Sequence, residues 1–451
     1  MPHPDITPPG IHPGDTIGIV SPSARFNDKL PDALNRSVAL LQSLGFRTKV
    51  FWTPDPSPSP IRTRAAHRLA ELRSAFADRE VSAIVCSSGG STANELLPEL
   101  LKPPRSRRHR CRRGGNDGND DGGNESEKDD DIMSVVRANP KPFVGYSDIT
   151  VLHHALAARA GLRTFYGPTA IQELGEAPEP LALTLESLLR TILTPGPDQE
   201  SSLPPPYNAP YALPRSPTYA PTAVPFLRLG PATSTEARDA SLPAPPWVWL
   251  RRGQARGPLF GGCLPVLVRL QGVPGLQSRR WVWGRGGGNG SYEEEEEEDY
   301  DDWAGNILFV ETPAANGSLD APYLLDRLRQ NLVDLVAQKV LDGVGGLVVG
   351  RCVGYDDERS RRAMETVVKD VVCPDVGADG WDRGRDREDG DETSGLESGD
   401  VTRTPRRRAK FPVLLNVDIG HTGPMVTLPM GALASLDSEK DTFRILEPPV
   451  L

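Results

Sequence analysis

Short apolar runs alternate with helical segments in the first part of the chain, and this alternation constrains the fold more than any other feature. TIGIVS, KVFW, SAIVCS and PFVGY are typical of buried strands, and apolar residues recur at helical spacing between them, as over 32–44 and 63–79. Such an order predicts a parallel sheet covered by helices on both faces. Ligands on these sheets bind at the carboxyl ends of the strands, so a site is expected in the loops after Val20, Cys86 and Val144.

The second half of the chain predicts a smaller unit of a different kind. NILFVE and GGLVVGR are typical of strands, residues 321–338 and 357–372 of helices, and FPVLLNVDIGH of a strand that runs into a Gly-His turn. We expect an α/β N-terminal domain over 1–185, a Pro-rich linker over 186–250 and a mixed α/β C-terminal domain over 251–451.

Four polar segments interrupt this pattern and dilute the hydrophobic residues to 37% of the chain. They cover about 102–131, 195–250, 284–302 and 377–409. None carries enough apolar side chains to offset its chain entropy, so we expect all four to be mobile. The first begins with a basic run, but an acidic run follows it directly, so we interpret it as a solvated loop and not as a nucleic-acid patch. GRGGGNG lacks the Lys-Ser/Thr of a phosphate-binding loop and is interpreted as linker.

Composition argues against several classes of protein. The net charge of -10 disfavours nucleic acid as a main partner, because polyanion binders carry a basic face. No apolar run is long enough to predict a membrane-spanning helix, and MPHPDITPPG has neither the basic nor the apolar region of a signal peptide. The five cysteines are scattered without a CxxC pair, which favours reduced thiols in a cytoplasmic protein. No HExxH motif, Cys/His cluster or Walker lysine supports a metal or nucleotide cofactor.

Ser147 lies where a predicted strand gives way to a predicted helix. In VGYSDIT the strand ends at Gly145 and the helix begins with Asp148. A serine on such a tight turn presents its hydroxyl at the top of the sheet, and the helix N-terminus behind it offers N–H groups to a developing oxyanion. A helix N-cap serine produces the same local pattern, so the turn alone leaves both interpretations open.

Three other positions carry groups that a nucleophilic serine needs. Gly90 follows Gly89 in a strand-to-helix turn, where the backbone can approach a ligand and donate a second N–H. His421 follows Gly420 at a strand end, and imidazole suits proton transfer near neutral pH. Glu311 closes the strand ILFVE, and its carboxylate could orient a histidine ring. A plain turn, a structural turn histidine and a solvated strand end remain the alternatives.

Taken in order, the motifs of the chain resemble the LD-carboxypeptidase family of serine peptidases. The matching segments are IHPGDTIGIVSPSA, AIVCSSGGSTANELLP, KPFVGYSDIT, GPLFGGCLPVLVRLQGV, ILFVET and NVDIGHTGPMVTLPMG. Six motifs in one order are far more specific than any one of them. GYSDIT, NVDIGHTGP and LPMG are more similar to the microcin-immunity branch, which resembles amidases for peptidyl or aminoacyl nucleotide conjugates, than to the cell-wall recycling branch.

The resemblance implies a flavodoxin-like N-terminal domain, a β-rich swivelling C-terminal domain and, commonly, a homodimer. It also implies a triad that falls on Ser147, Glu311 and His421, working without a metal or other cofactor. In that mechanism the imidazole takes the serine proton, the serine attacks an amide carbonyl and the glutamate holds the imidazole. The backbone N–H groups of Asp148 and of Gly90 or its neighbour would bind the oxyanion.

One departure and two rival functions accompany this expectation. The family's GGNL segment reads GGCL at 261–264, which puts a substrate-side asparagine contact in question. A glutamine amidotransferase-like amidase would require a cysteine where the chain has Ser147. A non-catalytic small-ligand binding protein would leave the three side chains apart. We therefore expect a cytoplasmic serine hydrolase, a carboxypeptidase or amidase, that acts on a small peptide or a peptidyl or aminoacyl conjugate.

Overall fold

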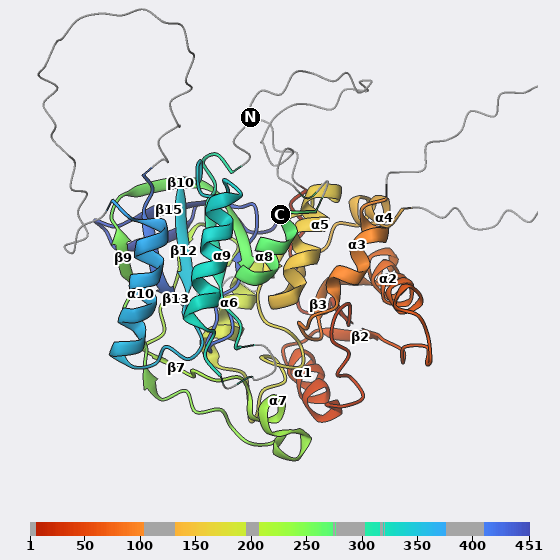
Figure 1. Cartoon of the computed structure of the whole chain (residues 1–451). Coiled ribbons are helices and arrows are strands. Elements are labelled where there is room, and N and C mark those ends of the chain that lie inside the picture. Colours follow the sequence, from red (N-terminus) through yellow and green to blue (C-terminus); the bar gives the residue numbers. More distant parts are fainter. Residues whose placement is uncertain are drawn as a thin grey trace, which may run out of the picture.

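The computed structural model of the protein contains two sheets, each with helices packed on it (Figure 1). The structure describes residues 6–102, 131–194, 207–273, 276, 303–315, 319, 321–375 and 410–451. The expectation of mobility for the polar segments at 103–130, 284–302 and 377–409 falls on residues outside this description.

The first sheet has six strands in the order β14-β5-β4-β3-β1-β2. Its strands are β1 (Thr16–Val20), β2 (Arg47–Phe51), β3 (Val81–Cys86), β4 (Phe143–Gly145), β5 (Phe165–Tyr166) and β14 (Leu428–Pro429). The first five pair in parallel, and β14 alone runs antiparallel, against β5. The predicted parallel N-terminal sheet is therefore confirmed. Its edge strand β14 comes from the C-terminal part of the sequence, after residue 420.

Helices cover both faces of this sheet because successive strand residues point to opposite sides. The helices are α1 (Pro31–Ser43), α2 (Ile61–Ala77), α3 (Leu97–Leu100), α4 (Ile132–Ala138), α5 (Thr150–Ala160) and α6 (Ala182–Ile192). Ile84 and Cys86 of β3 pack with the buried faces of α2, α4 and α5. Ala83 and Val85 pack on the opposite side with α1 and α6. Both layers are buried hydrophobic cores, which makes the strand ends rigid supports for the loops that follow.

The second sheet is mixed and has eight strands in the order β6-β16-β15-β10-β11-β12-β13-β9. Its strands are β6 (Tyr211–Ala212), β9 (Val248–Arg251), β10 (Gln254–Cys263), β11 (Ile307–Glu311), β12 (Gly346–Gly350), β13 (Val413–Val417), β15 (Leu433–Asp437) and β16 (Thr442–Ile445). The four central strands from β10 to β13 are parallel, and the outer pairs are antiparallel. The mixed α/β C-terminal unit is confirmed.

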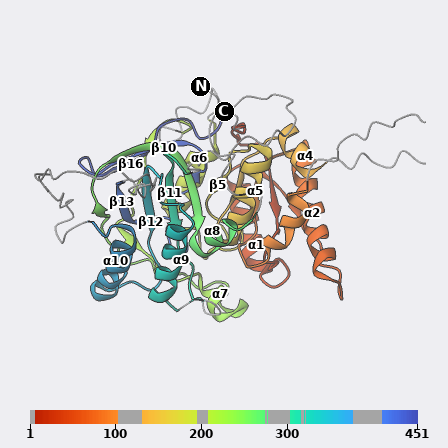
Figure 2. The same ribbon diagram turned by 45° about the horizontal axis from the view of Figure 1, so that its top comes forward.

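Three helices accompany the second sheet, namely α8 (Leu264–Leu270), α9 (Leu325–Ala337) and α10 (Glu358–Val372). α9 and α10 lie side by side, and α8 lies between α9 and α5 of the first unit (Figures 1 and 2). α10 begins at an N-cap aspartate, Asp357, whose carboxylate accepts the backbone N–H groups of Arg359 and Ser360. Among the described helices, none combines the length and apolar character that crossing a membrane requires.

Part of the Pro-rich segment is folded, so the expectation that 195–250 buries too little apolar surface is wrong for 207–250. This stretch contains β7 (Thr218–Tyr219), α7 (Pro225–Leu229) and β8 (Leu242–Pro243) besides β6 and β9. Tyr211, Leu213 and Trp247 are buried in the core of the second sheet. Phe226 is buried with Val224 in a cluster under α1. A few large side chains among prolines suffice, because proline has little backbone freedom to lose on folding.

Candidate active site

The three predicted side chains come from the carboxyl ends of parallel strands in both sheets. Ser147 follows β4, Glu311 is the last residue of β11, and His421 lies in the loop after β13. The first sheet supplies the serine and the second supplies the other two. The site therefore lies where the two sheets meet, at the kind of edge where parallel sheets hold ligands.

A continuous chain of hydrogen bonds joins these three side chains. The Nε2 atom of His421 lies 2.9 Å from Ser147 Oγ, and its Nδ1 atom lies 2.6 Å from Glu311 Oε2. A carboxylate can only accept, so Nδ1 carries the proton and Nε2 is left to accept from the serine hydroxyl. Glu311 is fully buried, whereas the His421 side chain is 16% exposed. The arrangement can take a proton from the serine and hold the resulting imidazolium.

Ser147 occupies a left-handed backbone conformation that few non-glycine residues adopt. Its φ is +63°, and the short 3-10 turn Ser147–Ile149 leads directly into α5. Gly145 makes this sharp turn possible, because an added Cβ would lie 3.0 Å from Ile149 and 3.1 Å from Cys86. Thr150 Oγ1 donates to the Ser147 carbonyl at 2.6 Å and closes the turn. The strain is of the kind that active sites store.

The loop after β3 brings backbone N–H groups close to the serine. A Cβ added to Gly89 would lie 2.9 Å from Ser147 Cβ, so only glycine allows this approach. Gly90 is exposed with φ of +146°. Within the described part of the chain, no hydrogen bond engages the backbone N–H of Gly90 or of Asp148. The sequence predicted such an approach for Gly90 or its neighbour, and Gly89 is the glycine that packs directly against Ser147.

Asp148 holds the two loops together through its side chain. Its Oδ2 accepts from Ser23 Oγ at 2.6 Å and from the backbone N–H of Ala93 at 2.8 Å. The side chain is buried, and Arg269 lies 3.7 Å from its other oxygen. The carboxylate thus ties the loops after β1 and β3 to the serine turn, and its backbone N–H stays beside Ser147.

The loop that carries His421 is fixed by a buried arginine. Arg351 pairs with Asp418, donates to Thr422 Oγ1 at 3.1 Å and donates to the Pro424 carbonyl at 2.7 Å. Both side chains of the ion pair are 3% exposed. Gly420 lies directly against the glutamate, because a Cβ there would lie 2.7 Å from Glu311 Cβ. The backbone around the imidazole is therefore held on both sides.

Two neighbouring histidines of α5 contact backbone carbonyls next to the site. The pKa of His153 is lowered to about 3 and that of His154 to about 4, mainly because both rings are buried. His153 Nε2 lies 2.8 Å from the Gly145 carbonyl, and His154 Nε2 lies 2.9 Å from the Gly261 carbonyl. Both rings are thus neutral and hydrogen-bonded, which leaves His421 as the imidazole available for proton transfer at this site.

The GGCL segment ends β10 beside the glutamate. Cys263 pairs in register with Glu311, and its backbone N–H donates to Thr150 Oγ1 at 3.0 Å. Burial, reinforced by the charge of Glu311, raises the pKa of the Cys263 thiol well above its usual range. The position at which the resemblance implies an asparagine therefore holds a neutral, buried thiol.

Two tyrosines near the serine had no signal in the sequence beyond apolar character. The ring of Tyr146 meets the His421 ring edge-on at 5.0 Å between centroids, and its hydroxyl lies 2.7 Å from Gln172 and Glu173. The hydroxyl of Tyr166 lies between Ser147 and Glu311. Neither could be found from periodicity, because Tyr166 lies in a short strand and Tyr146 directly follows one, where aromatic residues usually fill a core.

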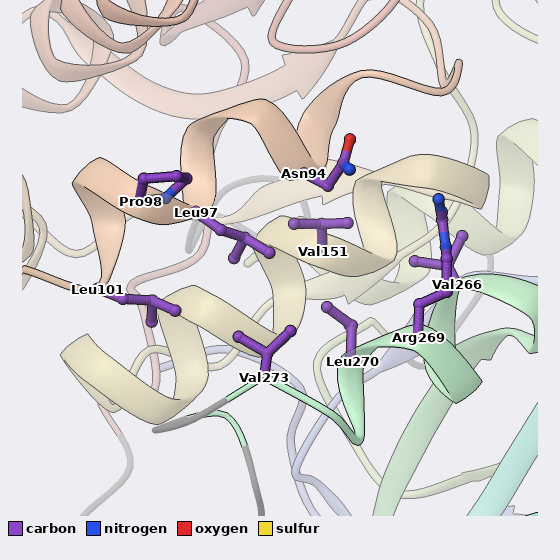
Figure 3. Close-up of a pocket in the computed structure, with 9 residues that line it drawn as sticks. All are labelled: Asn94, Leu97, Pro98, Leu101, Val151, Val266, Arg269, Leu270 and Val273. Carbon is purple, nitrogen blue, oxygen red and sulfur yellow. The ribbon is translucent and has the colours of Figure 1, made fainter. Parts of the chain in front are cut away.

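A cavity of about 410 Å³ lies elsewhere, between α3, α5 and α8 (Figure 3). It is lined mostly by aliphatic side chains such as Leu97, Val151 and Leu270, with Arg269 at one end. None of the three predicted side chains lines it. Over the described residues, no group of three or more His, Cys, Asp or Glu side chains is arranged to hold a metal ion.

Comparisons with known proteins agree with the fold and the motif order. The LD-carboxypeptidase N-terminal domain model matches residues 17–112 and 122–167, and the LD-carboxypeptidase C-terminal domain model matches 256–378 and 380–436. The probable murein peptide carboxypeptidase of Bacillus subtilis (strain 168) is 24% identical over 437 residues, which cover 96% of this chain and 92% of the relative.

Two further comparisons involve the microcin C7 self-immunity protein MccF. The Escherichia coli protein is 24% identical over 453 residues, covering 99% of this chain and 96% of the relative. A solved structure of MccF with aspartyl sulfamoyl adenosine aligns with a TM-score of 0.64 at 20% identity and covers 99% of this chain and 100% of that chain. The structural likeness extends over both sheets.

Proposed function

Because the chain belongs to the LD-carboxypeptidase family and is a serine carboxypeptidase hydrolase, we propose that Ser147 is its nucleophile, His421 its general base and Glu311 the carboxylate that orients the base. The observation that carries this proposal is the unbroken Ser147–His421–Glu311 hydrogen-bond chain. A non-catalytic relative of the same fold would have no need to hold these three side chains within hydrogen-bond reach.

The reaction begins when His421 Nε2 takes the proton of Ser147 Oγ and the oxygen attacks the carbonyl carbon of an amide. The C–N bond then breaks, and the imidazolium returns the proton to the leaving amine. Water attacks the acyl-serine by the same route and releases the acid. Glu311 keeps Nδ1 protonated and stabilises the imidazolium in both halves, as its 2.6 Å contact favours.

The negative charge that develops on the carbonyl oxygen needs donors on the side opposite the imidazole. We assign this role to the backbone N–H groups of Asp148, which follows Ser147, and of Gly90, which follows the Gly89 packed against Ser147. Neither N–H makes another hydrogen bond among the described residues. Removing one such donor typically lowers turnover about a hundredfold to a thousandfold. The φ of +146° at Gly90 favours glycine, so the position of this N–H depends on the glycine.

The names of the relatives support a proposal for the substrate class. One relative is named for murein peptide, and solved MccF structures contain aspartyl sulfamoyl adenosine or glutamyl sulfamoyl guanosine. We propose a small peptide or an aminoacyl or peptidyl conjugate as substrate. Motif likeness to the microcin-immunity branch favours the conjugates.

A substrate panel tests this proposal. Wild-type protein is incubated with an aminoacyl sulfamoyl adenosine, with a murein tetrapeptide that ends in a D-residue and with its all-L counterpart, and products are followed by mass spectrometry. We expect hydrolysis of the aminoacyl conjugate and a transient acyl adduct on the peptide that contains Ser147. Absence of hydrolysis across the panel, together with no fluorophosphonate adduct on that peptide, would contradict the proposal.

Substitution of Gly420 by alanine should lower kcat about a hundredfold, because the new Cβ would displace the Glu311 carboxylate that it meets. The substitution also carries a backbone cost, since φ at Gly420 is +95°. Gly14 provides the matched control: its φ is +100°, and nothing lies within 4 Å of an added Cβ. Gly14→Ala should lose a little stability and keep full activity. Equal activity of the two variants would show that the contact with Glu311 has no catalytic consequence.

A further inference from the structure

We propose that Tyr166 is a positioning residue that fixes both ends of the Ser147–His421–Glu311 chain through one hydroxyl group. The inference rests on the proposed function. The Tyr166 hydroxyl lies 2.5 Å from Glu311 Oε1 and 3.1 Å from the backbone nitrogen of Ser147. One atom thus contacts the turn of the nucleophile in the first sheet and the carboxylate of the second sheet.

The fold leaves the Tyr166 side chain no freedom to move away. Tyr166 lies in β5 between β4 and β14, opposite Gly145 on one side and Leu428 on the other. Its side chain is fully buried. The ring meets Phe309 edge-on at 5.2 Å and lies 5.7 Å from the ring of His153, measured between centroids. The strand next to Ser147 and the strand that follows His421 therefore position this hydroxyl together.

The direction of both hydrogen bonds follows from the protonation state of Tyr166. Burial, with the nearby charge of Glu311 as a further cause, raises the pKa of the phenol well above its usual range. The hydroxyl is therefore neutral and has one proton, which it donates to Glu311 Oε1. Its lone pair accepts the backbone N–H of Ser147.

Each bond has a separate consequence. On the Glu311 side, the two carboxylate oxygens are divided between Tyr166 and His421, which prevents rotation of the carboxylate and draws part of its charge away from the imidazole. On the Ser147 side, the bond satisfies an N–H in a strained turn and holds the hydroxyl of the nucleophile in place. The same bond removes the N–H of Ser147 from the set of oxyanion donors, which leaves Asp148 and Gly90.

Four buried titratable groups around Glu311 and His421 are neutral near neutral pH, namely Cys352, Cys263, Tyr146 and His153. Burial raises the pKa of Cys352 to about 11, and it raises those of Cys263 and Tyr146 well above their usual ranges. His153, which packs on the Tyr166 ring, has its pKa lowered to about 3. The hydrogen bonds that Glu173 accepts come from Tyr146 and Thr169, and not from Ser147 or His421. We therefore expect the acidic limb of the pH profile to reflect protonation of His421, whose charged form is stabilised by Glu311 to a degree that depends on Tyr166.

Tyr166→Phe tests the inference with a readout that a merely structural role would not move. We expect kcat to fall about 10- to 100-fold with KM changed less than about threefold. The acidic limb of kcat/KM should also move to higher pH, because Glu311 regains its full charge and stabilises protonated His421 more strongly. Tyr211→Phe is the matched control, because Tyr211 is also buried but lies in β6, an edge strand of the second sheet. This control should change neither kcat nor the position of the acidic limb.

A graded variant keeps the test decisive if Tyr166→Phe folds poorly. A fluorinated tyrosine at position 166 preserves shape and strengthens the hydroxyl as a donor, so the acidic limb should move to lower pH. A kcat within twofold of wild type with an unmoved limb, in Tyr166→Phe or in the fluorinated protein, overturns the inference. If Ser147→Ala retains full activity, the proposed function fails instead, so the two failures are distinguishable.

Discussion

Replacement of Ser147 by alanine is expected to lower kcat by about a million-fold, to the level that oxyanion donors and binding alone sustain. The change removes the attacking oxygen and leaves the backbone of the turn unaltered. His421 loses only its 2.9 Å contact with Oγ, and Ser147 is not fully buried, so the free energy of unfolding should change by less than about 0.5 kcal/mol. Steady-state kinetics and thermal unfolding by circular dichroism measure the two effects separately.

Fluorophosphonate labelling supplies the control for this variant. Wild-type protein should label on Ser147 and Ser147→Ala should not. Ser134, an exposed serine of α4, is the matched substitution, and Ser134→Ala should label like wild type. Turnover or labelling that persists in Ser147→Ala after repurification would remove this residue from its assigned role.

Replacement of Arg351 by methionine is expected to lower the free energy of unfolding by about 3–5 kcal/mol, because it leaves the buried carboxylate of Asp418 without its counter-charge. The same change removes the donors to Thr422 and to the Pro424 carbonyl, which hold the loop around His421. Activity should therefore fall together with stability. Denaturant unfolding and kcat/KM at a temperature where the variant is folded measure the two losses.

A double substitution separates these two effects. Arg351→Met combined with Asp418→Leu removes both charges, so most of the lost stability should return. Activity should remain low, because the contacts to the loop of His421 are still missing. A single variant that costs less than about 1 kcal/mol, or a double variant with full activity, would show that this ion pair does not support the loop.

The sequence carried enough information to predict the fold because its apolar periodicity is undisturbed in the core. The strand runs ending at Val20 and Cys86, and the helix with Leu328 and Leu332, lie where the spacing placed them. Ser147, Glu311 and His421 also lie together as the motif order implied, although 110 residues separate the last two. Strand ends can be predicted from sequence because a polar residue that closes an apolar run has few places to lie other than the end of a buried strand.

What could not be predicted depends on contacts between distant, short elements. Tyr166 lies in a two-residue strand and looks like any core aromatic residue, so its hydroxyl partners had no local signal. The pairing of β14 with β5 places Leu428 opposite Tyr166, although most of the second unit lies between these two residues in the sequence. The buried side chains of 207–250 were missed because proline content was taken as a measure of disorder, whereas single aromatic residues such as Tyr219 found partners in the folded body.

The antiparallel pairing of β14 with β5 has a consequence for how such chains can be recombined. A chimera that joined residues up to 194 of this protein to an unrelated partner would leave β5 as an uncovered border strand. Unpaired backbone groups on such a border invite a second molecule to add a strand, and the product would self-associate. Exchange of parts between relatives therefore succeeds only when the stretch from His421 to Pro429 comes from the same protein as the first sheet. Each half of the chain depends on this stretch for its structure.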